Sequence, residues 1–192
     1  MDQRMKIRLQ TEEEVIKIYT ERMELDFPPA ELKPLETLLK LSREGSYLCY
    51  GAYDESKCLA YAYFMKHPKE NVILLDYFAV EKVVRGQGYG SCALERFLKQ
   101  MEPGITVLIE AEQPDTAEDA QQLQIRRRRI AFYEKNHMLL SEIVTEAFGV
   151  EYVILLNQPC EKEKVTRCYM DIYQSMIPKE HYSKVRILSM EM

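Results

Sequence analysis

The feature that most constrains the fold is a strand, a glycine loop and a helix written in succession over residues 71–101. Residues 72–80 are almost all apolar and rich in β-branched and aromatic side chains, which predicts a strand buried on both faces. Glycines follow at alternate positions between 86 and 90, and from Ser91 the apolar residues recur at helical spacing. The segment therefore predicts a buried strand that leads through a glycine-rich loop into an amphipathic helix.

Such an arrangement is suited to binding phosphate groups. The first N–H groups of a helix have no partner within it, and the helix dipole places partial positive charge there. Glycine lets the backbone approach a ligand closely, so the loop and the helix together form a phosphate cradle. The spacing Gly86-x-Gly88-x-Gly90 differs from the dinucleotide-binding G-x-G-x-x-G, and no Gly-Lys-Ser/Thr of a P-loop is present. A nucleotide-binding domain is thus disfavoured, while a tight turn without a ligand is the alternative that glycines alone allow.

An arginine before the first glycine makes the motif more specific. The run 85–90, Arg-Gly-Gln-Gly-Tyr-Gly, fits Arg/Gln-x-x-Gly-x-Gly/Ala and follows the strand residues Tyr-Phe-Ala-Val at 77–80. This resembles the acyl-CoA-binding motif of the GNAT N-acetyltransferase superfamily. The resemblance implies an α/β (α+β) fold with a mixed, mainly antiparallel sheet, flanked by helices and splayed between its two central strands, 71–80 and 105–111.

The resemblance also implies a cosubstrate, acetyl-CoA, and the backbone that holds it. The loop amides would bind the CoA pyrophosphate, and the preceding strand would hold the pantetheine arm and the acetyl group. The residues expected to contact the cosubstrate are Phe78, Ala79, Val80, Arg85, Gly86, Gln87, Gly88, Tyr89, Gly90, Ser91 and Arg126.

A second stretch, Ala131–Met138, resembles another GNAT signature. The match is good over the Phe-Tyr-Glu-Lys run at 132–135, and it departs from the family at three places. This chain has Arg126 where the family often has asparagine, and Arg129 where alanine is common. After the helix it has His-Met in place of the usual Gly-Phe. The departure at Arg126 puts that residue's CoA contact in doubt.

Acetyl transfer to an amine needs two proton transfers, and the sequence offers candidates for both. An amine of pKa ~10.4 is almost wholly protonated at neutral pH, so a base must help to remove its proton, and the leaving CoA thiolate gains from a proton donor. The resemblance places the acid at Tyr133. Asp76, a carboxylate inside an apolar run, and Glu110, at the end of the next strand, are the two candidate bases. Neither is excluded, and a mechanism in which neither acts as the base stays open.

Composition bounds the class of protein. The 192 residues suffice for one domain with a sizeable core, and no apolar run approaches the ~20 residues that span a bilayer. Five cysteines without a C-x-x-C pair, and no apolar N-terminal stretch of signal-peptide type, indicate a cytoplasmic location. A net charge of −5 argues against nucleic-acid binding, and three scattered histidines argue against a metal site.

The remaining chain predicts alternating strands and helices in one domain, 1–192, with residues 158–192 as a helical extension. A capping box at Thr11 and Glu14 starts a helix to about 25, and a second box is expected at Asp115 and Glu118. The extension carries an amphipathic helix whose apolar face is expected to pack on the domain or on a second copy in a homodimer. Other strands are expected at 5–9, 46–53, 58–66, 139–147 and 150–157. Three further helices are expected: one that starts at Pro34, one that ends near 135, and one over 161–176.

The function that the sequence favours is N-acetyl transfer from acetyl-CoA to an amine acceptor whose identity the sequence does not reveal. The alternative is a GNAT-like acyl-CoA-binding module that regulates without transferring acetyl groups.

Overall fold

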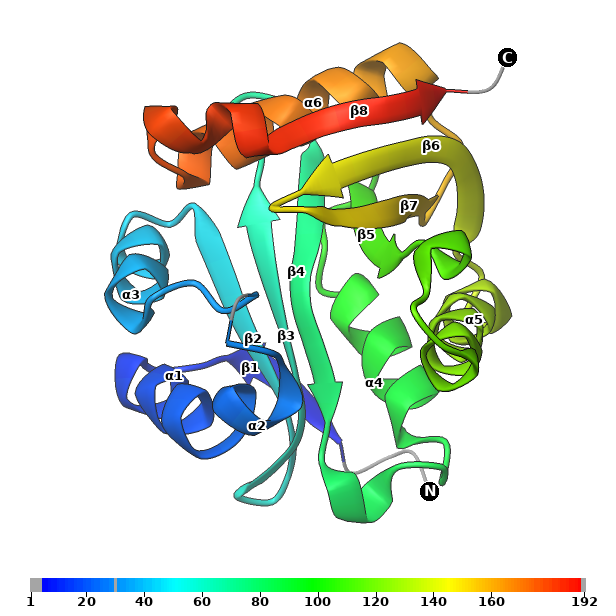
Figure 1. Cartoon of the computed structure of the whole chain (residues 1–192). Helices are drawn as coiled ribbons and strands as arrows, with labels where there is room; N and C mark the ends of the chain where they lie inside the picture. The colour runs from blue at the N-terminus through cyan, green and yellow to red at the C-terminus, as the bar shows by residue number, and fades with distance from the viewer. Residues whose placement is uncertain (1–4, 30, 191–192) are drawn as a thin grey trace. The chain divides into compact units, whose positions relative to one another are not determined.

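The computed structural model describes residues 5–29 and 31–190, which form one eight-stranded mixed sheet with flanking helices (Figure 1). The strand order is β1-β2-β3-β4-β5-β7-β6-β8. The chain divides into two compact units, Met1–Met65 with Asp76–Glu102, and Lys66–Leu75 with Pro103–Met192, so strand β4 contributes to both. The expected mixed α/β fold is confirmed, whereas the assignment of residues 1–192 to one domain stays a prediction.

The first unit contains the N-terminal helices and the central hairpin. Its elements are β1 (Lys6–Leu9), α1 (Glu12–Ile18), a π-helical turn (Tyr19–Met23), α2 (Glu24–Asp26), α3 (Leu35–Arg43), β2 (Tyr47–Asp54), β3 (Lys57–Lys66), β4 (Val72–Val80), a 3₁₀ turn (Lys82–Val84) and α4 (Tyr89–Leu98). The helix expected over 12–25 is present as α1, the π turn and α2 in direct succession.

The predicted helix boundaries of this unit have the expected chemistry. The Thr11 side chain accepts from the backbone of Glu14, and the Glu14 side chain accepts from the backbone of Thr11, so the capping box is confirmed. After α3, Gly45 takes φ +72°, and the Ser46 N–H donates to the Leu41 carbonyl at 3.0 Å. This is a Schellman motif, which satisfies the last carbonyls of the helix and explains the glycine.

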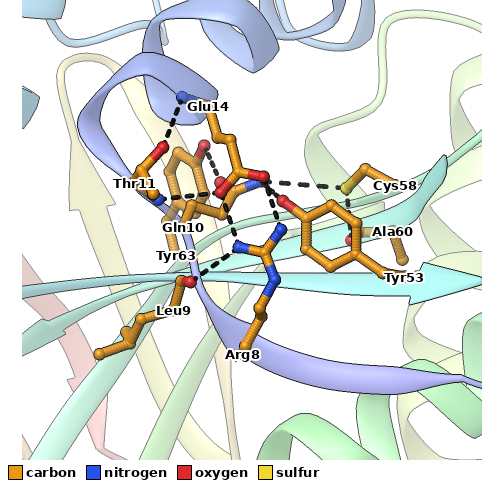
Figure 2. A network of polar contacts seen from close by, with 9 residues as sticks. All are labelled: Arg8, Leu9, Gln10, Thr11, Glu14, Tyr53, Cys58, Ala60 and Tyr63. Carbon is orange, nitrogen blue, oxygen red and sulfur yellow. Dashed lines mark hydrogen bonds and ion pairs between the residues drawn. The ribbon is translucent and has the colours of Figure 1, made fainter. Parts of the chain in front are cut away.

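A polar network ties β1 and α1 to the β2–β3 hairpin (Figure 2). The guanidinium of Arg8 donates to both carboxylate oxygens of Glu14, at 2.7 and 2.6 Å, and lies 4.0 Å from the centre of the Tyr53 ring. Gln10 accepts from the Tyr63 hydroxyl at 2.7 Å and donates to the Tyr53 hydroxyl at 3.1 Å. The first strand and helix are therefore held to the hairpin by charge and hydrogen bonds as well as by packing.

The second unit is built around the strands that follow α4. Its further elements are β5 (Thr106–Glu112), a 3₁₀ turn (Pro114–Thr116), α5 (Ala120–Lys135), β6 (Leu139–Ala147), β7 (Val150–Leu156), α6 (Lys162–Met176), a 3₁₀ turn (Lys179–Lys184) and β8 (Val185–Met190). A two-residue turn joins β6 and β7, with φ +53° at Phe148 and +86° at Gly149. Positive φ at both turn positions matches the right-handed twist of a hairpin.

The pairing of β4 with β5 follows the expectation. The two strands are parallel, and in the described residues their pairs run from Val72↔Thr106 to Leu75↔Ile109, which involves only the first four residues of β4. Beyond these pairs β5 continues its antiparallel pairing with β7 as far as Glu112↔Tyr152. The prediction that β4 and β5 are not paired along their full length is confirmed.

Two predictions for this unit need correction. The N-cap of α5 is Asp119, whose side chain accepts from the Gln122 N–H at 2.7 Å, and Asp115 lies in the preceding 3₁₀ turn. The capping box expected at Asp115 and Glu118 is therefore wrong. Residues 158–192, expected to be a helical extension, also contain the strand β8, which pairs with β6 and ends the sheet.

Helix α6 buries its apolar stripe within the chain. Its buried residues are Val165, Cys168, Tyr169, Ile172, Tyr173 and Met176. Of the two coverings left open for this face, the chain itself is the one observed. No helix in the described part of the chain is long and apolar enough to cross a membrane.

Candidate active site

The glycine loop has the backbone that the phosphate cradle requires. Gly86 and Gly88 take φ +75° and +86°, and a Cβ built at either position would meet nothing within 4 Å. Glycine is therefore needed here for its conformation rather than for space. Gly88 is the N-cap of α4 and no side chain caps that end, so the first N–H groups of the helix point outward uncapped.

The side chain of Arg85 is engaged within its own unit. Its Nε donates to the Val80 carbonyl at 2.8 Å, and its Nη2 donates to Asp26 Oδ1 at 2.7 Å. The side chain of Asp26, at the end of α2, is buried and also accepts from the Tyr61 hydroxyl at 3.0 Å. Arg85 therefore fixes the start of the loop against β4 and α2.

Asp76 is paired with a residue that the sequence analysis did not single out. The Lys33 ammonium donates to both oxygens of its carboxylate, at 2.7 and 2.8 Å, and the Tyr47 hydroxyl donates to Oδ2. The expectation that a carboxylate in this apolar run has a partner is met. Lys33 and Asp76 lie 43 positions apart, so only the fold brings them together.

Glu110 is held by two tyrosines from α6. The hydroxyl of Tyr169 donates to Oε1 at 2.7 Å, and the hydroxyl of Tyr173 lies 2.9 Å from both oxygens. Burial and then the negative charge of Glu110 raise the pKa of Tyr169, so its hydroxyl keeps the proton that it donates. The C-terminal helix, which the sequence analysis left without a role, thus supports one of the two candidate bases.

Tyr133 lies on α5 with its side chain buried, and Arg126 lies two turns earlier. Burial raises the pKa of Tyr133 to about 12, and its hydroxyl has no hydrogen-bond partner in the part of the chain that the structure describes. Arg126 donates to the Gln113 carbonyl at 2.7 Å and to Thr116 Oγ1 at 3.0 Å, so it braces the turn before α5.

The candidate residues divide between the two units. The glycine loop, Asp76 and Phe78 belong to the first, and Glu110, Arg126 and Tyr133 to the second. Within the first unit, the ring of Phe78 packs edge-on against Phe97 of α4 with 6.3 Å between centroids, which links the strand to the helix that carries the loop. Among the described residues, no group of three or more His, Cys, Asp or Glu side chains is placed to hold a metal ion.

Comparison with known proteins points to one family. Residues 13–138 match the family model described as "Acetyltransferase (GNAT) family". No curated protein sequence matches the chain significantly.

Solved structures share the fold at low sequence identity. A GNAT-family acetyltransferase from Bacteroides thetaiotaomicron superposes with a TM-score of 0.68 at 20% identity, over 92% of this chain and 98% of its own. The ribosomal-protein-S18-alanine N-acetyltransferase of Escherichia coli gives 0.57 at 19% identity, over 82% and 97%. Spermidine N-acetyltransferase from Vibrio cholerae, solved with CoA and spermine, gives 0.61 at 8% identity, over 81% and 95%.

Proposed function

The chain belongs to the GNAT family of acetyltransferases, and on this premise we propose that it transfers an acetyl group from acetyl-CoA directly to the primary amine of an acceptor. The observation that carries the proposal is the loop before α4, where two glycines at positive φ precede an uncapped helix N-terminus. Its N–H groups and the helix dipole favour an anion, and the CoA pyrophosphate is the anion that the family motif binds.

The residues proposed to hold acetyl-CoA are those of the motif. The amides of 86–91 bind the pyrophosphate, and the β4 residues Phe78, Ala79 and Val80 hold the pantetheine arm and the acetyl group. Arg85 acts by fixing the loop, since its guanidinium is bonded to Val80 and Asp26. Arg126 uses Nη1 for its hydrogen bonds to Gln113 and Thr116, and its other guanidinium N–H groups are proposed to contact a CoA phosphate.

Tyr133 is proposed to protonate the leaving CoA thiolate. The Tyr133 side chain is mostly buried, and its hydroxyl makes no hydrogen bond within the described part of the chain, so the hydroxyl is available to a ligand atom. With its pKa raised to about 12, Tyr133 carries its proton throughout the neutral range and is able to donate it.

The base is proposed to be Asp76 or Glu110, and the two carboxylates differ in their partners. Asp76 is neutralised by the Lys33 ammonium, so it accepts a proton from an amine only after that ammonium moves away. Glu110 accepts hydrogen bonds from the hydroxyls of Tyr169 and Tyr173. Comparing Asp76→Asn with Glu110→Gln decides between them, because loss of the base removes the acidic limb of the kcat/KM profile.

The test of the function is release of the CoA thiol from acetyl-CoA in the presence of a panel of amines, with binding of acetyl-CoA measured separately by calorimetry. We expect both binding and amine-dependent release. If acetyl-CoA bound but no polyamine, amino acid, aminoglycoside or peptide N-terminus caused release of the CoA thiol, the result would instead support a regulatory acyl-CoA-binding module.

A further inference from the structure

The Lys33 side chain brings a primary ammonium to a buried carboxylate on β4. Its Nζ lies 2.7 and 2.8 Å from the two oxygens of Asp76, and the side chains of Lys33 and Asp76 are 17% and 7% exposed. Holding both charges away from water is costly unless their geometry is good, so this contact is a specific feature of the fold.

The backbone of Lys33 is fixed independently of its side chain. Its N–H donates to the Tyr77 hydroxyl at 2.9 Å, and its carbonyl accepts from the Tyr19 hydroxyl at 2.9 Å. The Tyr77 hydroxyl in turn donates to the Glu31 carbonyl at 2.8 Å. These bonds anchor the loop before α3 through its main chain. The loop therefore has anchors besides the ion pair between Lys33 and Asp76.

The surroundings of Asp76 suit any primary ammonium. Oδ2 accepts from the Tyr47 hydroxyl, and burial, with the charge of Asp76 as a second cause, raises the pKa of Tyr47 so that it remains a donor. The Lys33 Nζ also lies 5.3 Å from the centre of the Tyr77 ring, within the range of a cation–π contact. A carboxylate, a phenol donor and an aromatic ring form one site for a cation.

We propose that Asp76, Tyr47 and Tyr77 form an ammonium-binding subsite on the acceptor side of the enzyme, and that Lys33 is its internal occupant, which a cationic acceptor must displace. The inference rests on the proposed function, because β4 is the strand assigned to the acetyl group. Lys33 then determines specificity: while it neutralises Asp76, a second ammonium on the acceptor finds no free carboxylate, and diamines gain nothing over monoamines.

The subsite is tested first by chemical rescue, which needs no catalysis. Lys33→Ala removes the ammonium and its stem, and n-propylammonium chloride supplies both from solution. We expect Lys33→Ala to melt below the wild type, and the probe at about ten times its Kd to raise that melting temperature by roughly 3 °C or more. The wild type and Lys33→Ala/Asp76→Asn should not respond, and tetramethylammonium chloride, which lacks N–H donors, should not rescue.

Kinetics test the role in specificity. Lys33→Met keeps the length and packing of the stem and removes only the charge. The ratio of kcat/KM for 1,4-diaminobutane to that for n-butylamine compares two and one ammonium groups on the same carbon stem. We expect this ratio to rise about 10-fold in Lys33→Met, the size of one added hydrogen-bonded charge contact.

Two results would overturn the inference: a Lys33→Ala protein that n-propylammonium does not stabilise, or a ratio that stays unchanged in Lys33→Met. Either would show that the ion pair serves only to hold the loop. If Lys33→Ala does not fold, the ratio in Lys33→Met decides alone. If the wild type releases no CoA thiol with any amine, the proposed function fails, while the melting experiment still decides the subsite.

Discussion

At the residue scale, the candidate acid and the candidate bases differ in how the fold has prepared them. The Tyr133 hydroxyl makes no hydrogen bond within the described part of the chain, whereas Asp76 and Glu110 already accept hydrogen bonds from other side chains. In the proposed mechanism a ligand contacts the Tyr133 hydroxyl directly, whereas Asp76 or Glu110 acts as the base only after giving up some of its present hydrogen bonds. Substitutions that change one atom or one charge separate these roles best.

Replacing Tyr133 with Phe removes the hydroxyl and keeps the ring. If Tyr133 is the acid, kcat should fall at least ~10-fold, since general acid–base help is worth ~10²–10⁴-fold. The Kd of acetyl-CoA should change much less, because thiolate protonation belongs to the reaction. Since burial raises the pKa of Tyr133 to about 12, its deprotonation should cause no fall of wild-type kcat between about pH 8 and 10.

The matched control is Tyr182→Phe, which removes a hydroxyl that donates to the Gln174 carbonyl at 2.9 Å. It should leave kcat within about twofold of the wild type. Equal kcat in wild type and Tyr133→Phe would reduce Tyr133 to a packing residue.

Charge at the glycine loop is isolated by comparing Gly88→Asn with Gly88→Asp. Both side chains have the same size and both tolerate positive φ better than other residues, so the strain at φ +86° is shared. The aspartate adds a negative charge to the loop. The Kd of acetyl-CoA for Gly88→Asp should therefore exceed its Kd for Gly88→Asn by about 10-fold or more. Calorimetry on the two folded variants measures the difference.

Gly104 offers a control with the same backbone angle. It also takes φ +86° with nothing within 4 Å of a built Cβ, and it lies outside the motif. Gly104→Asn and Gly104→Asp should bind acetyl-CoA alike. If Gly88→Asn and Gly88→Asp bound acetyl-CoA with equal affinity, the proposal that this loop binds the CoA pyrophosphate would be wrong.

At the element scale, what the sequence predicts well are features with a local chemical cause. The capping box at Thr11, the Schellman glycine at Gly45 and the Phe148-Gly149 turn each depend on residues within a few positions of one another. The predicted start of α5 is wrong because Asp115-x-x-Glu118 and Asp119-x-x-Gln122 both have the pattern of a helix N-terminus. Residues 114–116 instead form a separate 3₁₀ turn, which begins at Pro114 and is bonded by Arg126.

Contacts between distant segments could not be predicted in this way. The sequence indicates that Asp76 needs a partner, but no residue near Asp76 in the chain identifies that partner as Lys33. The same holds for Tyr169 and Tyr173, whose helical spacing shows a shared face and not the carboxylate of Glu110 that this face reaches. The pairing of β8 with β6 is likewise a contact between segments about forty residues apart, as in Glu146↔Arg186, and the sequence does not indicate it.

The link between β1 and α1 predicts an acid-sensitive contribution to stability. The hydrogen bonds from Arg8 lower the pKa of Glu14 to about 2, below its unfolded value, so the stabilisation is present above about pH 4.5 and is lost as the pH falls towards 2. Because Glu14 is partly exposed, solvent screening limits the effect to about 1 kcal/mol. Glu14→Gln keeps a side chain that can close the capping box, and it should lower the unfolding free energy by that amount at pH 7.

Thermal unfolding from pH 7 down to pH 3 measures this contribution, and the gap between wild type and Glu14→Gln should narrow on acidification. Glu95→Gln breaks an exposed pair with Lys99 on α4 and serves as the control, with a smaller effect. A pH-independent gap would mean that the charge of Glu14 does not stabilise the fold.

At the scale of the whole molecule, the family match and the fold do not end at the same place. The match stops at residue 138, yet the strand order ends with β7, β6 and β8, all of which lie beyond it. Helix α6 also lies beyond the match and supplies both tyrosines that hold Glu110. The C-terminal part is therefore expected to be an integral part of the second unit rather than an accessory.

Truncation after Gln158 tests that expectation. The shortened chain loses the six buried side chains of α6, each worth about 1.5–3 kcal/mol of burial. Their combined loss is comparable to the whole stability of an ordinary domain, about 5–15 kcal/mol. It also makes β6 an edge strand, because the side that paired with β8 is left unpaired. We expect this chain to lose its cooperative thermal transition, as followed by circular dichroism and calorimetry.

Truncation after Pro178 is the matched control, because it removes β8 and keeps α6. This chain should still unfold cooperatively at a lower temperature, and its exposed β6 edge should make it more prone to aggregate, which light scattering detects. If the chain ending at Gln158 unfolded cooperatively at the wild-type temperature, residues 159–192 would be a separable extension. Glu110 would then have to keep its position without Tyr169 and Tyr173, and its claim to be the base would no longer depend on α6.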